Sequence, residues 1–132
     1  MATGGCHCGA IRYEISGEPI NSLLCHCSDC QRASGAPMVG WIMVRDDQLR
    51  VTGEPSIYAS SESARRYFCI QCGTSLFYSN TDIMPDRVDI QLATLDEPSE
   101  FPPQGHVQVA DRIDWMKDAH GLPHHERWAN GD

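Results

Sequence analysis

The sequence predicts a mainly β fold with one or two short helices. Most segments with a regular hydrophobic pattern are short, mix apolar with polar residues and are rich in β-branched or aromatic side chains. Such segments are typical of strands in a half-buried sheet. Residues that favour turns separate them, and the predicted turns lie at 17–19, 45–47, 53–55, 72–73 and 84–86.

Six segments have the composition and spacing expected of strands. In chain order they are 10–16, 38–44, 48–52, 65–70, 75–79 and 87–93. Between the first and the second, Ser28 or Asp29 can cap a short helix, SDCQRAS, that Gly35 would end. A weaker pattern over 113–121 predicts one further turn of helix, and the Pro-rich stretch 97–103 is expected to be a loop.

The length of 132 residues suits a single domain that spans residues 1–132. No window approaches the roughly 18 to 20 consecutive apolar residues that are needed to cross a bilayer. The first ten residues, MATGGCHCGA, lack the basic and apolar regions of a secretory signal. We therefore expect a soluble protein in the cytoplasm, where thiols are kept reduced.

The charge distribution argues against a nucleic-acid partner, and the lack of an apolar span argues against a membrane partner. The formal net charge is −8, which would repel a phosphate backbone. The ten Lys and Arg residues are scattered, apart from the pair Arg65 and Arg66, so no basic stripe is formed. Small molecules are the expected binding partners.

The seven cysteines favour metal binding over disulfides, because their number is odd and the expected compartment is reducing. They fall into three groups, which are Cys6 with Cys8, Cys25 with Cys27 and Cys30, and Cys69 with Cys72. If each group stays intact, only the first and last groups together supply four ligands and leave three. Four thiolates make a closed structural zinc site, whereas three leave one position open for a substrate.

The closed site is predicted to consist of Cys6, Cys8, Cys69 and Cys72 and to hold a structural zinc ion. In an extended segment residues i and i+2 project to the same side, so the thiols of Cys6 and Cys8 can bind one ion. Cys69 and Cys72 would be joined by a tight turn in which Gly73 takes a positive φ. Binding would tie together residues about 60 positions apart and stabilise the fold.

The remaining triad, Cys25, Cys27 and Cys30, permits three interpretations. It can form an open, catalytic zinc site, and the N-terminus of the predicted helix would favour the thiolate form of its sulfurs. It can instead be a second structural site that His26, His106 or another histidine closes. The third interpretation is a redox pair of Cys27 and Cys30.

At these residues the chain resembles the glutathione-dependent formaldehyde-activating enzyme family, also called S-(hydroxymethyl)glutathione synthase-like proteins, whose fold is the Mss4-like zinc scaffold. The matching pieces are GCHCGA at 5–10, CHCSDCQRASGAP at 25–37 and FCIQCGTSLFY at 68–78, followed by Asp114-Trp115 and Gly121-Leu122-Pro123. The resemblance implies a structural zinc at the first and last cysteine pairs and a catalytic zinc at the middle triad.

The resemblance also implies a reaction, in which a thiol such as glutathione condenses with formaldehyde to an S-hydroxymethyl adduct. Candidates to move the proton are His26, Ser34 and His106. Candidates to bind the carboxylates of the thiol are Arg32, Arg65 and Arg66. The alternative function is a non-catalytic zinc scaffold that binds a partner protein, because the wider Mss4-like group includes such proteins.

Overall fold

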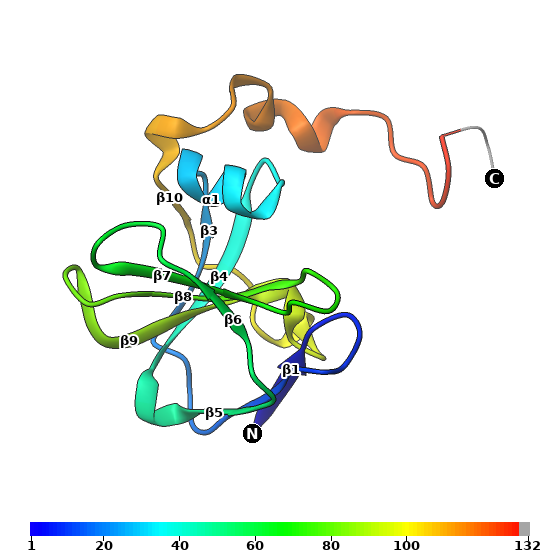
Figure 1. The fold of residues 1–132 in the computed structure, drawn as a ribbon. Helices are drawn as coiled ribbons and strands as arrows, with labels where there is room; N and C mark the ends of the chain where they lie inside the picture. Colours follow the sequence, from blue (N-terminus) through cyan, green and yellow to red (C-terminus); the bar gives the residue numbers. More distant parts are fainter. Residues whose placement is uncertain (130–132) are drawn as a thin grey trace.

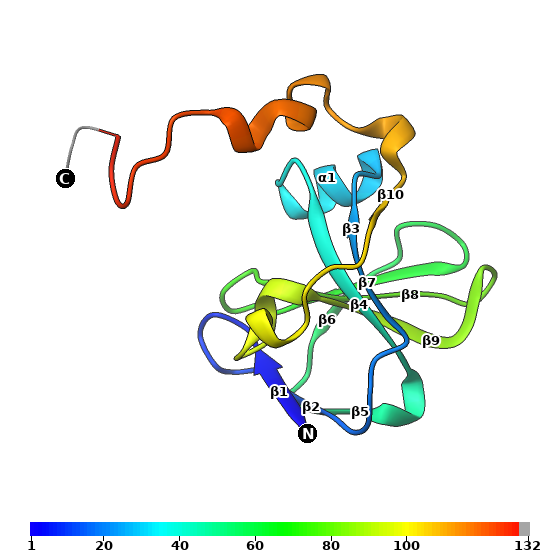
Figure 2. The same ribbon diagram turned by 180° about the vertical axis from the view of Figure 1, so that it is seen from behind.

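The computed structural model describes residues 1–129 and contains two β-sheets. The smaller sheet is antiparallel and has the order β1 (Ala2–Gly5), β2 (Arg12–Ile15) and β5 (Leu49–Thr52). Figures 1 and 2 show it at one end of the molecule, with helix α1 and the C-terminal segment at the other end.

The larger sheet has seven strands in the order β10-β3-β4-β9-β8-β7-β6. In that order the strands are His106–Val107, Asn21–Cys25, Val39–Arg45, Met84–Gln91, Ser75–Asn80, Ala64–Phe68 and Ser56–Tyr58. β10 pairs with β3 in parallel, and every other pair in this sheet is antiparallel. The two sheets confirm the prediction of a mainly β fold.

Helix α1 (Ser28–Ser34) begins directly after Cys27 and ends at Gly35, whose φ of 63° is the left-handed conformation that favours glycine. The other helical segments are short 3-10 turns: η1 (Asp46–Gln48), η2 (Leu92–Thr94), η3 (Pro98–Glu100), η4 (Val109–Asp111) and η5 (Asp114–Gly121). The last lies within the helical turn predicted at 113–121. None of the helices in residues 1–129 has the length and apolar character that crossing a membrane requires.

All six predicted strands are present, but four further strands, β1, β3, β6 and β10, were not predicted. They are only two to five residues long, so a repeating pattern is hard to detect in them. The predicted turn at 84–86 is wrong, because these residues open strand β9. Asp86 still has a positive φ of 61°, a conformation that Asp tolerates better than most residues, so the turn-like residue locally distorts the strand.

The main core lies where the two sheets face each other. Tyr13 of β2 meets Phe77 of β8 with ring centroids 5.4 Å apart in an edge-to-face arrangement. Fully or almost fully buried aliphatic residues from both sheets surround this pair, and they include Ile15, Ile42, Val44, Val88 and Ile90. This face of the larger sheet is therefore filled by side chains and holds the sheets together.

The opposite face of the larger sheet lies toward α1 and carries a row of directly paired residues. Strand alternation places each member on the same side, since cross-strand partners share a face. From β3 across to β6 the row is Asn21, Met43, Asp89, Tyr78, Arg66 and Tyr58. A carboxylic acid and a guanidinium thus lie on the half of the molecule that also contains the middle cysteines.

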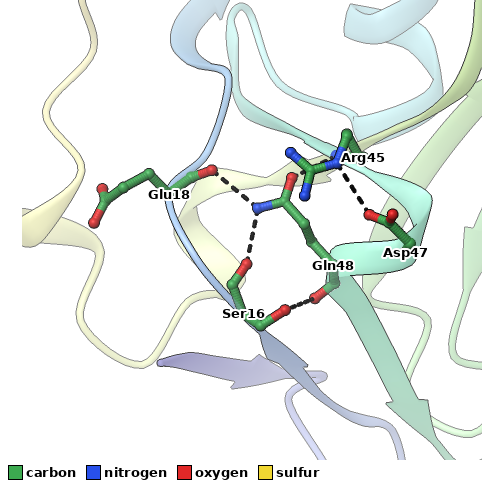
Figure 3. Close-up of polar contacts among 5 residues, drawn as sticks. All are labelled: Ser16, Glu18, Arg45, Asp47 and Gln48. Atoms are coloured by element: carbon green, nitrogen blue, oxygen red, sulfur yellow. Dashed lines mark hydrogen bonds and ion pairs between the residues drawn. The ribbon is translucent and has the colours of Figure 1, made fainter.

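A buried glutamine joins the ends of β2 and β4 to η1. The side-chain nitrogen of Gln48 donates to the carbonyls of Ser16 and Glu18 at 2.8 and 3.0 Å, and its oxygen accepts from the N–H of Arg45 at 2.8 Å (Figure 3). Arg45 also forms an exposed ion pair with Asp47. Because the amide of Gln48 satisfies three main-chain groups, it fixes how the chain passes between the two sheets.

Candidate functional site

Four cysteine sulfurs from distant parts of the chain form one compact group. The Sγ atoms of Cys6, Cys8, Cys69 and Cys72 all lie within 4.8 Å of one another, and this is the one such group of three or more His, Cys, Asp or Glu ligands in residues 1–129. Sulfurs that bind one tetrahedral ion at about 2.3 Å are about 3.8 Å apart. The separations Cys6–Cys8 of 3.6 Å and Cys8–Cys69 of 3.8 Å match this spacing, so the group can hold a metal ion.

Two turns present these four sulfurs. The N–H of Gly73 donates to the carbonyl of Cys69 at 2.7 Å, and Gly73 has a φ of 79°, as predicted for this turn. The prediction of an extended segment at Cys6 and Cys8 is wrong, because the N–H of Gly9 donates to the carbonyl of Cys6 at 3.1 Å and closes a turn. The sulfurs of Cys6 and Cys8 still lie close together, but a turn brings them together instead of the alternation of a strand.

Hydrogen-bond donors are already aimed at sulfurs of this group. The N–H of Ile11 lies 3.2 Å from Sγ of Cys6, and the hydroxyl of Thr74 lies 3.2 Å from Sγ of Cys72. The Thr74 hydroxyl and N–H lower the pKa of Cys72 to about 5. At Cys8 the main-chain donor of Ala10 is outweighed by burial and the neighbouring thiols, which raise the pKa to about 11. Donors at Cys6 and Cys72 thus favour the thiolate form, which is the form that binds metals, at two of the four sulfurs.

The middle cysteines border a separate pocket with a volume of about 270 Å³. Cys25 ends β3, Cys27 precedes α1 and Cys30 lies within α1. Sγ of Cys25 and Sγ of Cys30 are 3.9 Å apart, close to the spacing of two ligands on one ion. The three sulfurs do not all lie within 4.8 Å of one another, so two of the three have the separation that a shared ion needs.

Cys25 and Cys30 interact directly through their sulfurs. The hydrogen bond between the two thiols lowers the pKa of Cys25 to about 7. The same hydrogen bond and burial raise the pKa of Cys30 well above its usual range. The neighbouring Cys30 thiol has the largest influence on the pKa of Cys25, in place of the helix N-terminus expected from the sequence.

The histidines and the serine that were candidates for proton transfer do not border this pocket. His26 is 1% exposed, and its Nε2 lies 2.9 Å from Nδ1 of His106. Ser34 accepts a hydrogen bond from the side chain of Gln91 at 3.0 Å. Neither His26 nor His106 joins the middle cysteines in a compact ligand group among the described residues.

Asp89, which no sequence motif points to, lies in the pocket instead. It is half-buried on β9 and forms no ion pair within residues 1–129. Burial raises the pKa of Asp89 to about 7. The other ionisable groups around the pocket are Cys25 from β3, Cys27 before α1, Asp29 and Cys30 from α1, Tyr78 from β8 and Arg66 from β7. Asp89 reaches the pocket because of the register of β9 with β4 and β8. No local pattern in the sequence therefore identifies it as a site residue.

Of the three arginine candidates, Arg66 alone borders the pocket. Its Nη2 lies 3.9 Å from Sγ of Cys30, and its guanidinium carbon lies 4.7 Å from the centroid of the Tyr78 ring. Arg65, the next residue, instead donates to the main-chain carbonyls of Ser61, Glu62 and Ala64. Arg32 is exposed on α1 and borders a neighbouring hollow.

Comparisons with known proteins agree with this architecture. Residues 1–111 match the family described as glutathione-dependent formaldehyde-activating enzyme. An uncharacterized lyase of Schizosaccharomyces pombe is 30% identical over 79 residues, which are 60% of this chain and 58% of the yeast protein. The match therefore spans less than two thirds of that relative. A crystal structure of a Rhodobacter sphaeroides protein shares the fold, with 24% identity, a TM-score of 0.64, and coverage of 80% of this chain and 99% of the other.

Proposed function

Because the chain belongs to the glutathione-dependent formaldehyde-activating enzyme family, we propose that it is a zinc enzyme of the carbon-sulfur lyase type that joins a thiol to a small aldehyde. The thiol is glutathione or a similar molecule, the aldehyde is formaldehyde or another small one, and the product is an S-hydroxyalkyl adduct. The observation that carries the proposal is the pocket in which Cys25, Cys27 and Cys30 border the same space as Asp89 and Arg66. The reduced thiols that this chemistry needs suit the cytoplasm.

Two groups of cysteines have different roles in this proposal. Cys6, Cys8, Cys69 and Cys72 hold a structural zinc ion that ties the turn after β1 to the turn after β7. Cys25, Cys27 and Cys30, of which Cys25 and Cys30 already have ligand-like spacing, would hold a second, catalytic zinc ion. When bound, that ion would supply a Lewis acid for the aldehyde oxygen or stabilise the substrate sulfur as a thiolate.

The walls of the pocket hold the reactants together. Leu23, Trp41 and Met43 form its apolar side, and Trp41 is buried. A volume of about 270 Å³ accommodates the sulfur end of a thiol beside a small aldehyde but not a large second substrate. Bringing two reactants into contact in this way lowers the entropic part of the barrier.

Asp89 moves the proton in the proposed reaction. The sulfur of the thiol forms a bond to the aldehyde carbon while the carbonyl π bond breaks, so the sulfur loses a proton and the oxygen needs one. The Asp89 carboxylate accepts the thiol proton and returns it to the oxygen of the adduct. No other reactant is required, and a carboxyl group with a pKa of about 7 is present in both forms at neutral pH.

Metal content distinguishes this enzyme from a zinc scaffold. The protein purified in zinc should contain two ions per chain, and Cys27→Ala should contain one while its circular dichroism spectrum stays that of the wild type. A scaffold in which the triad is a closed structural site predicts instead that Cys27→Ala loses its fold. A single ion in the wild-type protein would remove the catalytic zinc from the proposal.

A further inference from the structure

The pocket of the middle cysteines has an extensive apolar lining beside its ionisable groups. Leu23 of β3 and Trp41 of β4 are direct cross-strand partners, so their side chains lie on the same face of the sheet. The other apolar residues come from β4, β9, β10 and the turn between β8 and β9. Apart from the cysteines, the full apolar set is Leu23, Trp41, Met43, Ile83, Met84 and Val107. A ligand that fills the pocket therefore contacts hydrocarbon on several sides.

Two members of this set leave much of their apolar surface open to solvent. Ile83 is 72% exposed and Val107 is 36% exposed. The N–H of Ile83 donates to Oδ1 of Asn80 at 3.2 Å, which holds the main chain of the turn while the side chain stays exposed beside the pocket. Because apolar surface is unfavourable in water, an apolar group that covers these side chains gains binding free energy in proportion to the area covered.

The two reactants of the proposed reaction differ in whether they can use this apolar surface. Formaldehyde carries only hydrogen on its carbonyl carbon and covers little of it, and glutathione beyond its sulfur is a polar peptide. A larger aldehyde brings a substituent that stays on the carbonyl carbon while the carbon–sulfur bond forms and the carbonyl π bond breaks. The substituent takes no part in the transfer of the proton from sulfur to oxygen, so the same chemistry serves such an aldehyde.

We infer that the pocket selects aldehydes with a short apolar substituent over formaldehyde and over polar aldehydes. The inference rests on the proposed function and deepens it by assigning the class of the second substrate. Leu23, Trp41 and Met43 contact the substituent inside the pocket, and Ile83 covers it at the exposed side. The volume of about 270 Å³ limits the substituent to a few carbon atoms.

The test measures kcat/KM of the zinc-loaded protein for a series of aldehydes with glutathione, each value divided by the uncatalysed rate constant. Butanal should exceed acetaldehyde by about fifteen-fold, since each of its two additional methylene groups contributes about 0.8 kcal/mol, or about four-fold, when buried. Glycolaldehyde, which has a hydroxyl in place of the methyl group of propanal, is the polar control and should fall below propanal. Equal normalised values for acetaldehyde and butanal, or for glycolaldehyde and propanal, would overturn the inference.

A matched pair of variants assigns the preference to the pocket. Ile83→Ser should lower the butanal-to-acetaldehyde ratio roughly three-fold, because it removes apolar surface from the lining. Ile57→Ser makes the same change at a residue of β6 that is 59% exposed and does not border the pocket, and it should keep the wild-type ratio. Both side chains are exposed, so both variants should keep the wild-type circular dichroism spectrum. A wild-type ratio in Ile83→Ser and also in Met43→Gln, which places an amide on the pocket wall, would overturn the inference.

Binding of stable thioethers separates failure of the inference from failure of the proposed function. S-methylglutathione and S-butylglutathione are the formaldehyde and butanal adducts without their hydroxyl group, and their binding needs no catalysis. Calorimetry should show that S-butylglutathione binds at least about ten-fold more tightly, since its three additional methylene groups contribute about four-fold each when buried. Equal binding of the two thioethers would overturn the inference even if adduct formation is catalysed. Tighter binding of S-butylglutathione without catalysis of any aldehyde would overturn the proposed function alone.

Discussion

Nη2 of Arg66 on β7 lies 3.9 Å from Sγ of Cys30 on α1, although the two residues are 36 positions apart in the sequence. This contact joins the row of paired residues on the larger sheet to helix α1, which contains Cys30. It places a positive charge beside the sulfurs and leaves Nη1 free on the same group. The relationship links the pocket of the middle cysteines to a buried positive charge on the larger sheet.

Loss of one sulfur from the four-cysteine group should unfold the chain. Cys69 is almost fully buried in the main core, and its sulfur belongs to the compact ligand group. Cys69→Ala would leave three ligands and a cavity, so the metal and the free energy of folding that it supplies are lost together. We expect an unfolded circular dichroism spectrum and no cooperative thermal transition. A soluble Cys69→Ala protein with the wild-type Tm would contradict a structural role.

Asp89→Asn should change both the rate and its pH dependence. If Asp89 carries the proton, the wild-type kcat rises with pH through about 7, where the carboxyl group loses its proton. The variant should lose this step and be slower by about 10²-fold, the lower end for general acid-base catalysis. Asp29→Asn, an exposed carboxylate that borders the same pocket, is the control and should keep the step. An unchanged pH profile for Asp89→Asn would exclude Asp89 as the proton carrier.

The same substitution should stabilise the fold at alkaline pH. Burial raises the folded-state pKa of Asp89 from 3.8 to about 7, so the folded protein binds more protons than the unfolded chain between these values. Stability attributable to this group is therefore present below pH 4 and is lost as pH rises to 7. Asp89→Asn should have a higher Tm than the wild type at pH 8, and the difference should vanish at pH 4. A lower Tm at pH 8 would show that the carboxylate is stabilised by its surroundings.

The Gln48 side chain should be important for stability because it satisfies buried main-chain groups. Gln48→Leu keeps the approximate volume but leaves the carbonyls of Ser16 and Glu18 and the N–H of Arg45 without this partner. We expect a loss of about 1–3 kcal/mol in the free energy of unfolding, measured by urea denaturation. The control Asp47→Ala removes only an exposed ion pair and should change the value by less than about 1 kcal/mol. Equal effects of the two substitutions would contradict this role.

The contact between the smaller sheet and the segment after η2 should stabilise the fold in a pH-dependent way. The guanidinium of Arg12 and the hydroxyl of Thr3 donate to Asp96 and lower the pKa of that carboxyl to about 2. Because the folded-state pKa is depressed, the contribution is present above pH 4 and is lost as pH falls toward 2. Arg12→Gln should therefore lower Tm at pH 7 and have little effect at pH 2. Identical decreases at both values would assign the effect to packing instead of charge.

The grouping of the cysteines could be predicted from the sequence, because a closed zinc site needs four ligands and only the first and last cysteine pairs together supply four. Cys6, Cys8, Cys69 and Cys72 assemble as expected, even though the local geometry at Cys6 is a turn. Asp89 could not be predicted in the same way, since its place in the pocket depends on its register with Met43 and Tyr78. Register is a property of the whole sheet, and a shift of one residue would move each side chain to the other face. The single domain over residues 1–132 stays a prediction.

The most direct test of the central claim is the rate at which formaldehyde and glutathione form their adduct with and without the zinc-loaded protein. Carbon-13 exchange spectroscopy at equilibrium measures this rate. The background is the slow reaction of formaldehyde with glutathione in the absence of protein. We expect the wild type to accelerate exchange in proportion to its concentration and the folded Cys27→Ala variant to leave the background rate unchanged. Wild-type exchange equal to the background, in protein that contains two zinc ions per chain, would contradict the proposed function.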